Sequence, residues 1–174
     1  MEKMKIRGGT DPGASGGVAW QEDGKPASAL FTAKLPPTMT EIVDFFRKLS
    51  EDYEIVNMHL EDVGVHMQGN NASSSAKFAK SCGWVEAALY ALGIPTTMVA
   101  PKKWQACLGG LPPKGPARKA KIKELMQRHY PGTKLILPTA DATGILYYAT
   151  TCDNRPECRG KTVLGEDVGE AADA

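Results

Sequence analysis

The segment Gly9–Trp20 places one carboxylate, Asp11, at the end of a strand and at the start of a glycine-rich turn into the next strand. Pro12 lacks a backbone N–H and fixes its own φ, whereas the glycines that follow allow unusual backbone conformations and let a polyanion approach the main chain. Asp11 is therefore expected to stand rigidly in an open site, facing a metal ion or a phosphate. An ordinary Asp-Pro-Gly hairpin turn fits the same residues, so the turn alone leaves both interpretations open.

Two further acidic positions lie at the ends of predicted elements. Residues 55–63 alternate apolar and polar side chains as a strand does, and they release Glu61 and Asp62 into a loop. Far downstream, residues 138–149 are predicted to form a helix whose first turns carry Asp141, because Pro138 suits a helix start and the small residues allow close packing on a sheet. Acids from three distant segments are thus predicted to converge.

Five pieces of the sequence carry a resemblance to a known family through their order and spacing. They are Asp11-Pro12-Gly13 with Ser15-Gly16-Gly17, the strand-end Glu61, the segment Ser73–Trp84, the segment Val99–Trp104, and Ala140-Asp141-Ala142. Together they resemble the RuvC-type Holliday junction resolvases over residues 5–150. The resemblance is greatest to the phage and prophage branch, where a Pro-x-x-Trp element and a glycine-rich recognition loop commonly occur.

The resemblance implies a ribonuclease H-like α/β fold, a five-stranded mixed sheet flanked by helices. It implies that Asp11, Glu61 and Asp141 are catalytic and bind Mg²⁺, which Mn²⁺ can replace, in an endonuclease that nicks four-way or branched DNA junctions by two-metal phosphodiester hydrolysis. Clustered carboxylates suit Mg²⁺, which prefers hard oxygen ligands and keeps several waters. Asp62 is expected to be a solvated loop acid.

The chain departs from the family at two places. A fourth ligand, Asp or His, normally stands about one helical turn before the last acid, but Pro138 occupies that position and Leu137 precedes it. Either three acids suffice, or the chain is a junction-binding protein with weak or no catalysis. The first strand, residues 5–9, is also more polar than a buried central strand usually is. An actin-like or sugar-kinase-like fold also has an Asp in a glycine-rich first loop, but it needs a second domain that 174 residues do not provide.

Basic residues gather in one segment although the net charge is only +1. The predicted DNA contacts there are Lys102, Lys103, Lys114, Arg118, Lys119 and Lys121. Because duplex DNA carries about one negative charge per 1.7 Å of its axis, a basic face can bind it even when the whole chain is nearly neutral. A solvated amphipathic helix is the alternative interpretation of this segment.

The loop after Glu61 is predicted to make contacts specific to a junction. Its candidate DNA-binding side chains are His66, Met67, Gln68 and Asn70, with an ordinary surface loop as the alternative. The helix predicted over residues 75–92 is the candidate surface of a homodimer, because a symmetric four-way junction is cut at two related strands and a twofold dimer supplies two sites.

The remaining sequence predicts one domain over residues 1–152 and a flexible tail over residues 153–174. Further strands are predicted at 18–20, 29–32 and 96–99, helix starts at Thr40 and at Ser73–Ser75, and a helix end at Gly93. No stretch approaches the ~20 apolar residues of a membrane span, so a cytoplasmic protein is expected. There its cysteines would stay reduced, with Cys82 and Cys107 packed inside and Cys152 and Cys158 able to pair only on oxidation.

Overall fold

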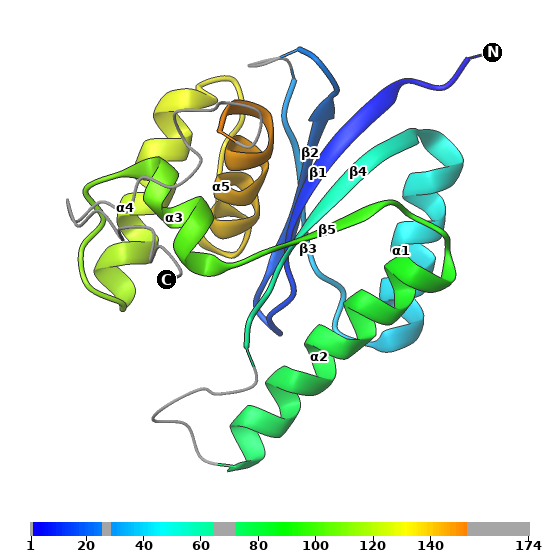
Figure 1. The fold of residues 1–174 in the computed structure, drawn as a ribbon, viewed down its shortest axis with the longest axis horizontal. Helices are drawn as coiled ribbons and strands as arrows, with labels where there is room; N and C mark the ends of the chain where they lie inside the picture. Colours follow the sequence, from blue (N-terminus) through cyan, green and yellow to red (C-terminus); the bar gives the residue numbers. More distant parts are fainter. Residues whose placement is uncertain (1, 26–28, 65–71, 153–174) are drawn as a thin grey trace, which may run out of the picture.

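The computed structural model describes residues 2–25, 29–64 and 72–152, and its strands form a single mixed sheet (Figure 1). The strands are β1 (Lys5–Asp11), β2 (Gly17–Glu22), β3 (Phe31–Lys34), β4 (Glu54–Glu61) and β5 (Thr96–Val99). They lie in the order β3-β2-β1-β4-β5, with β1, β2 and β3 antiparallel and β1, β4 and β5 parallel. The predicted five-stranded mixed sheet is confirmed, although β3 begins two residues later than the sequence suggested.

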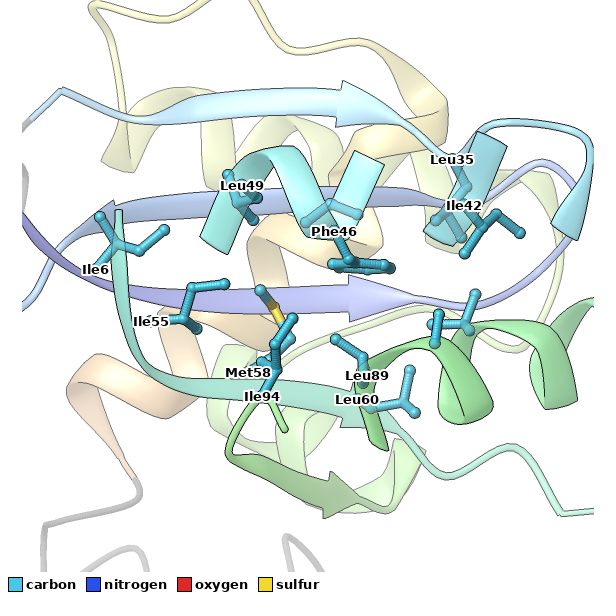
Figure 2. Close-up of a cluster of buried hydrophobic side chains, with 13 residues drawn as sticks. Ile6, Leu35, Ile42, Phe46, Leu49, Ile55, Met58, Leu60, Leu89 and Ile94 are labelled. Atoms are coloured by element: carbon cyan, nitrogen blue, oxygen red, sulfur yellow. The ribbon is translucent and has the colours of Figure 1, made fainter. Parts of the chain in front are cut away.

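Helices cover both faces of this sheet (Figure 1). One face carries α1 (Met39–Asp52) and α2 (Ala72–Ala91), and the other carries α3 (Pro101–Leu108), α4 (Pro116–His129) and α5 (Leu137–Thr151). Figure 2 shows the core beneath α1 and α2, where Phe46 and Leu89 meet Ile6, Met58 and other apolar side chains of the sheet. A second core on the opposite face contains Trp104, Ile122, Leu135, Ile145 and Leu146.

The N-terminus of α1 differs from the prediction by two residues. Thr38, rather than Thr40, is the N-cap: its hydroxyl accepts a hydrogen bond from the Glu41 backbone N–H at 3.3 Å, and the Glu41 carboxylate accepts from the Thr38 backbone N–H at 3.2 Å. This reciprocal capping box satisfies two backbone donors that the helix leaves free. The predicted cap at Ser73–Ser75 is also wrong, because these serines lie inside α2. The predicted end at Gly93 is confirmed by its φ of 65° just beyond the helix.

Although β1 is polar, it can lie at the centre of the sheet because glycines of β1 and β2 let a helix pack directly on the strand backbone. A Cβ added to Gly9 would lie 2.5 Å from the Ala142 carbonyl oxygen, and one added to Gly17 of β2 would lie 2.8 Å from the Pro138 carbonyl oxygen. Any side chain at these two positions would push α5 off the sheet. The apolar run expected in a central strand is therefore replaced by backbone-to-backbone contact, and α5 is fixed above the carboxyl end of β1.

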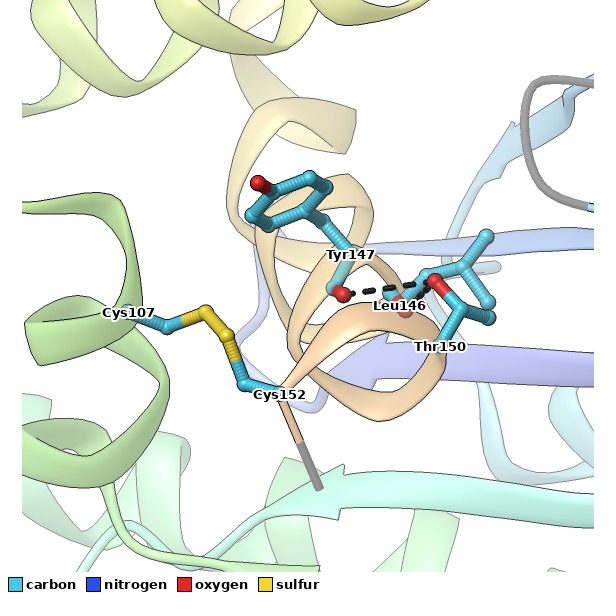
Figure 3. The surroundings of a disulfide bond; sticks show 5 residues. All are labelled: Cys107, Leu146, Tyr147, Thr150 and Cys152. Carbon is cyan, nitrogen blue, oxygen red and sulfur yellow. Dashed lines mark hydrogen bonds between the residues drawn. A yellow bond between two sulfur atoms is a disulfide. The ribbon is translucent and has the colours of Figure 1, made fainter. Parts of the chain in front are cut away.

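A disulfide bond joins the end of α3 to the end of α5 (Figure 3). It links Cys107 and Cys152, which are 45 residues apart in the sequence, with 6.6 Å between their Cα atoms. The prediction that Cys107 is a reduced packing residue is therefore wrong, and Cys152 pairs with Cys107 rather than with Cys158. Sequence spacing gave no sign of this pair because the two cysteines meet only when α3 packs against α5.

Some predictions fall on residues outside the described ranges. They concern Cys158, the tail over residues 153–174, and the loop side chains His66, Met67, Gln68 and Asn70. Within the part of the chain that the structure describes, no helix has the length and apolar character needed to span a membrane.

Candidate active site

Asp11 ends β1 and is held by the turn that follows it. Its Oδ1 accepts a hydrogen bond from the Gly13 backbone N–H at 3.1 Å, and the Gly16 N–H closes the turn on the Gly13 carbonyl at 2.8 Å. A Cβ on Gly16 would lie 2.1 Å from the Asp11 carbonyl oxygen, so only glycine fits there. The Asp11 side chain is buried, and this burial raises its pKa although the Gly13 N–H and Lys119 oppose the shift.

Glu61 ends β4, which lies beside β1 in parallel register with Leu60 opposite Thr10. The carboxyl ends of two adjacent parallel strands therefore place the Asp11 and Glu61 side chains at one edge of the sheet. Glu61 is also buried, and its Oε1 accepts a hydrogen bond from the Trp104 indole N–H at 2.9 Å. Burial, followed by the charge of Asp11, raises the pKa of Glu61 to about 7, while the Trp104 hydrogen bond acts in the opposite direction.

Asp141 reaches the same edge from α5. Its Oδ2 lies 3.5 Å from the Lys119 ammonium of α4, and its side chain is 14% exposed. Burial and the charge of Asp11 raise the pKa of Asp141, whereas Lys119 lowers it. Asp11, Glu61 and Asp141 line the same cleft, so the three predicted acids do converge, and the Lys119 ammonium lies beside them.

The three acids line a cleft of about 680 Å³. Its other walls are basic, polar or apolar, and they come from the loop after β4, from α2, α3 and α4, from the loop between α3 and α4, and from the start of α5. The basic or polar lining residues are Lys102, Gln105, Lys114, Arg118 and Lys119, and the apolar ones include Val63, Phe78, Pro101, Ile122 and Leu137. The cleft thus combines three acids with cationic side chains able to contact a phosphate backbone.

The predicted basic residues divide into two groups. Lys102, Lys114, Arg118 and Lys119 line the cleft, whereas Lys103 and Lys121 do not, and Lys121 forms an ion pair with Glu124. Arg118 is also committed to the protein itself, because it donates to the Pro112 carbonyl and to Gln105 Oε1, each at 2.8 Å. Arg118 therefore holds the loop between α3 and α4 against α3, whereas the Lys119 ammonium is paired with Asp141.

Two side chains at or behind the cleft had no role assigned to them from the sequence. Trp104 belongs to the Pro-x-x-Trp element, but only the packing of α3 beside β5 reveals that its indole meets Glu61. Phe78 follows the helical spacing of core residues, yet it lies at the cleft: a Cβ on Gly13 would lie 3.3 Å from its ring. The adjacent acid Asp62 is exposed, as expected for a solvated loop acid.

Carboxylates gathered at one edge of a sheet are candidate ligands of a divalent metal ion. Across residues 2–25, 29–64 and 72–152, no group of three or more His, Cys, Asp or Glu side chains is arranged to hold an ion as the side chains stand. However, Asp141 Oδ1 is buried and has no hydrogen-bond partner within those residues, and all three acids have raised pKa values. Buried, mutually repelling carboxylate oxygens are suitable ligands for a hard cation such as Mg²⁺. The donor set therefore fits the metal, although Pro138 supplies no fourth ligand.

Comparison with known proteins finds similar solved structures, among them two of RuvC. The search of protein-family models found no match, and the search of curated proteins found none either. The RuvC structure of Thermus thermophilus has a TM-score of 0.53 and 16% identity, and the match covers 83% of this chain and 95% of that one. The T. thermophilus RuvC in complex with a Holliday junction substrate has a TM-score of 0.59 and 17% identity, with 84% and 93% covered. The chain therefore has the RuvC-like form of the ribonuclease H-like fold.

Proposed function

We propose that this chain is a magnesium-dependent, structure-selective endonuclease that nicks four-way or otherwise branched DNA junctions. The observation that carries the proposal is the convergence of Asp11, Glu61 and Asp141, from two strand ends and a helix, in one cleft that also contains lysines. The RuvC-like fold supports it, since one similar structure is that of a RuvC bound to a Holliday junction.

Each group in the cleft has a distinct role in this proposal. Asp11, Glu61 and Asp141 would hold two divalent ions. When bound, magnesium supplies an activated water and charge stabilisation for the leaving oxygen of an in-line phosphodiester hydrolysis. Lys102, Lys114 and Lys119 bind the DNA phosphates. No side chain is needed as a covalent nucleophile.

The proposed substrate requires two such clefts. A four-way junction is twofold symmetric, so paired nicks are expected from a homodimer. We place the dimer surface on α2, where Tyr90 is 87% exposed and Lys80 lies over the Trp84 ring. The junction-specific contacts are assigned to His66, Met67, Gln68 and Asn70. The Pro101-x-x-Trp104 element favours the phage and prophage branch of these enzymes.

A junction-binding protein with little catalysis is the second candidate. Pro138 occupies the position of the fourth ligand, and the Lys119 ammonium lies beside Asp141 where a cation is needed. Both observations are compatible with a cleft that binds DNA phosphates without cutting.

Charge-removing variants test the proposal. Asp11→Asn, Glu61→Gln and Asp141→Asn are each expected to reduce Mg²⁺-dependent nicking of a labelled four-way junction by at least about 100-fold, since each removes a ligand. Asp62→Asn is the matched control, because Asp62 is the exposed neighbour of Glu61, and it should nick normally. Equal rates for Glu61→Gln and Asp62→Asn would contradict the proposed site. Junction binding without nicking by the unaltered chain would favour the second candidate.

A further inference from the structure

Trp104 is the largest fully buried side chain of the described residues and lies directly behind the candidate active site. It is 1% exposed, and its indole N–H donates to Glu61 Oε1 at 2.9 Å. A carboxylate that accepts a buried hydrogen bond from a rigid ring loses much of its rotational freedom. One oxygen of Glu61 is thus committed to the protein, and Oε2 is left for another ligand.

The indole packs against Gly144 of α5, which has no side chain. A Cβ added to Gly144 would lie 2.7 Å from Trp104 Cζ3 and 3.2 Å from Cε3, so the six-membered ring occupies the space that a side chain would fill. Gly144 follows Asp141 by three residues, which places both on neighbouring parts of one helix surface. The ring therefore lies between the helix that carries Asp141 and the strand end that carries Glu61.

The backbone around Trp104 is fixed from both sides. Helix α3 follows β5 directly, with Pro101 in its first turn, and β5 pairs with β4 so that Val99 lies opposite Glu61. At its other end α3 is joined to α5 through Cys107 and Cys152. The short helix thus connects the two elements that supply Glu61 and Asp141, and Trp104 is its only buried residue.

We propose that Trp104 is a positioning residue whose indole N–H, seated against Gly144, fixes the Glu61 carboxylate relative to Asp141 for binding of a divalent cation. The inference rests on the proposed function only in taking Glu61 and Asp141 as ligands of the metal ion. Changing partners that orient a metal ligand typically costs 10- to 100-fold in metal affinity or activity.

The first test needs neither metal nor catalysis. The protein has three tryptophans, and Trp104→Phe identifies the Trp104 indole N–H signal in a ¹H–¹⁵N spectrum. Glu61→Gln should move that signal and accelerate its exchange with solvent, because a weaker acceptor replaces the carboxylate. An unchanged signal in Glu61→Gln would overturn the positioning role whether or not the chain cuts DNA.

The second test measures Mn²⁺ binding by calorimetry in the absence of DNA. Trp104→Phe keeps an aromatic ring but loses the donor, and we expect about a tenfold higher Kd for Mn²⁺. Trp20→Phe is the matched control: the Trp20 indole N–H is buried without a hydrogen-bond partner in the described residues, so Mn²⁺ affinity should not change. Equal Kd values for the two variants would contradict the proposal.

A double-mutant cycle tests whether the Trp104 indole N–H and the space beside Gly144 act together. Gly144→Ala should weaken Mn²⁺ binding because the added methyl group displaces the indole. In the Trp104→Phe background the same substitution should reduce Mn²⁺ affinity little further, because the smaller phenyl ring no longer fills the space beside Gly144. Independent effects would overturn the link between Gly144 and Glu61. Reduced Mn²⁺ affinity in Trp104→Phe, combined with no nicking by the unaltered chain, would leave the positioning role intact and reject only the nuclease.

Discussion

Gly9 of β1 and Ala142 of α5 are in backbone contact, so that a Cβ on Gly9 would lie 2.5 Å from the Ala142 carbonyl oxygen. This contact sets the height of α5 above the sheet. It therefore also sets how closely Asp141 approaches Asp11, which follows Gly9 by two residues on the same strand. The position of the acidic cleft depends on a glycine that has no chemical role of its own.

Gly9→Ala is expected to destabilise the protein by about 1–3 kcal/mol or more, because the added methyl group meets backbone atoms that cannot rotate away. The free energy of unfolding in urea measures this effect. Gly83→Ala provides the opposite control, since Gly83 lies inside α2 with nothing within 4 Å of an added Cβ. There alanine should stabilise the helix by about 0.5–1 kcal/mol. Equal effects of the two variants would contradict the close approach of α5.

The acidic cleft should make the metal-free protein less stable as the pH rises. The pKa of Glu61 is about 7 in the folded chain and 4.5 without perturbation, so the folded state binds more protons between these values. The contribution of Glu61 to the free energy of unfolding is therefore greatest below about pH 4.5. It falls by up to about 3 kcal/mol as the pH rises from there through 7. Urea unfolding at pH 5 and pH 8, without divalent ions, measures the difference. Glu61→Gln should reduce this dependence, and an identical dependence in that variant would disprove the assignment.

The Lys119 ammonium beside Asp141 is expected to contact DNA phosphate. Lys119→Gln should weaken binding of a four-way junction and lower the dependence of log Kobs on log salt concentration by about one unit. The measurement is a fluorescence titration at several salt concentrations, with Ca²⁺ in place of Mg²⁺ to prevent cutting. Lys103→Gln is the control, because Lys103 is exposed outside the cleft lining. A salt dependence that changes equally in both variants would contradict a specific role of the cleft.

The bond between Cys107 and Cys152 should stabilise the chain measurably. Closing a 45-residue separation restricts the unfolded state, and Cys107→Ser is expected to lower the free energy of unfolding by about 2–4 kcal/mol. Urea unfolding of the unaltered protein with and without reductant should show a similar loss. Cys107→Ser itself should not respond to reductant. If reductant leaves the unaltered protein unchanged, the pair does not stabilise the fold.

The sequence predicted the parts of this molecule that depend on local patterns. Strand β5 was predicted at its observed bounds, and the acids at the ends of β1 and β4 and on α5 were placed in the correct elements. Parallel pairing then brings Asp11 and Glu61 together without further information. The start of α1 was misplaced because Thr38 and Thr40 are both suitable caps, and only the contact with Glu41 distinguishes them.

Features that depend on packing between distant elements could not be predicted. The polarity of β1 looked unfavourable for a central strand because the sequence does not show that Gly9 contacts α5 through its backbone. The roles of Trp104 and Cys107 also depend on where α3 packs, which no periodicity of an eight-residue helix reveals. The basic segment was predicted to contact DNA, which stays a prediction, and only the structure separates Lys119 in the cleft from Lys121, which pairs with Glu124.

The most direct measurement compares cleavage of a labelled four-way junction and a linear duplex of the same sequence, each with and without Mg²⁺. We expect paired nicks in the junction only, dependent on Mg²⁺ and lost in Asp11→Asn. Failure to nick the junction at any Mg²⁺ concentration, or equal cutting of junction and duplex, would contradict the claim that this cleft is the active site of a structure-selective endonuclease.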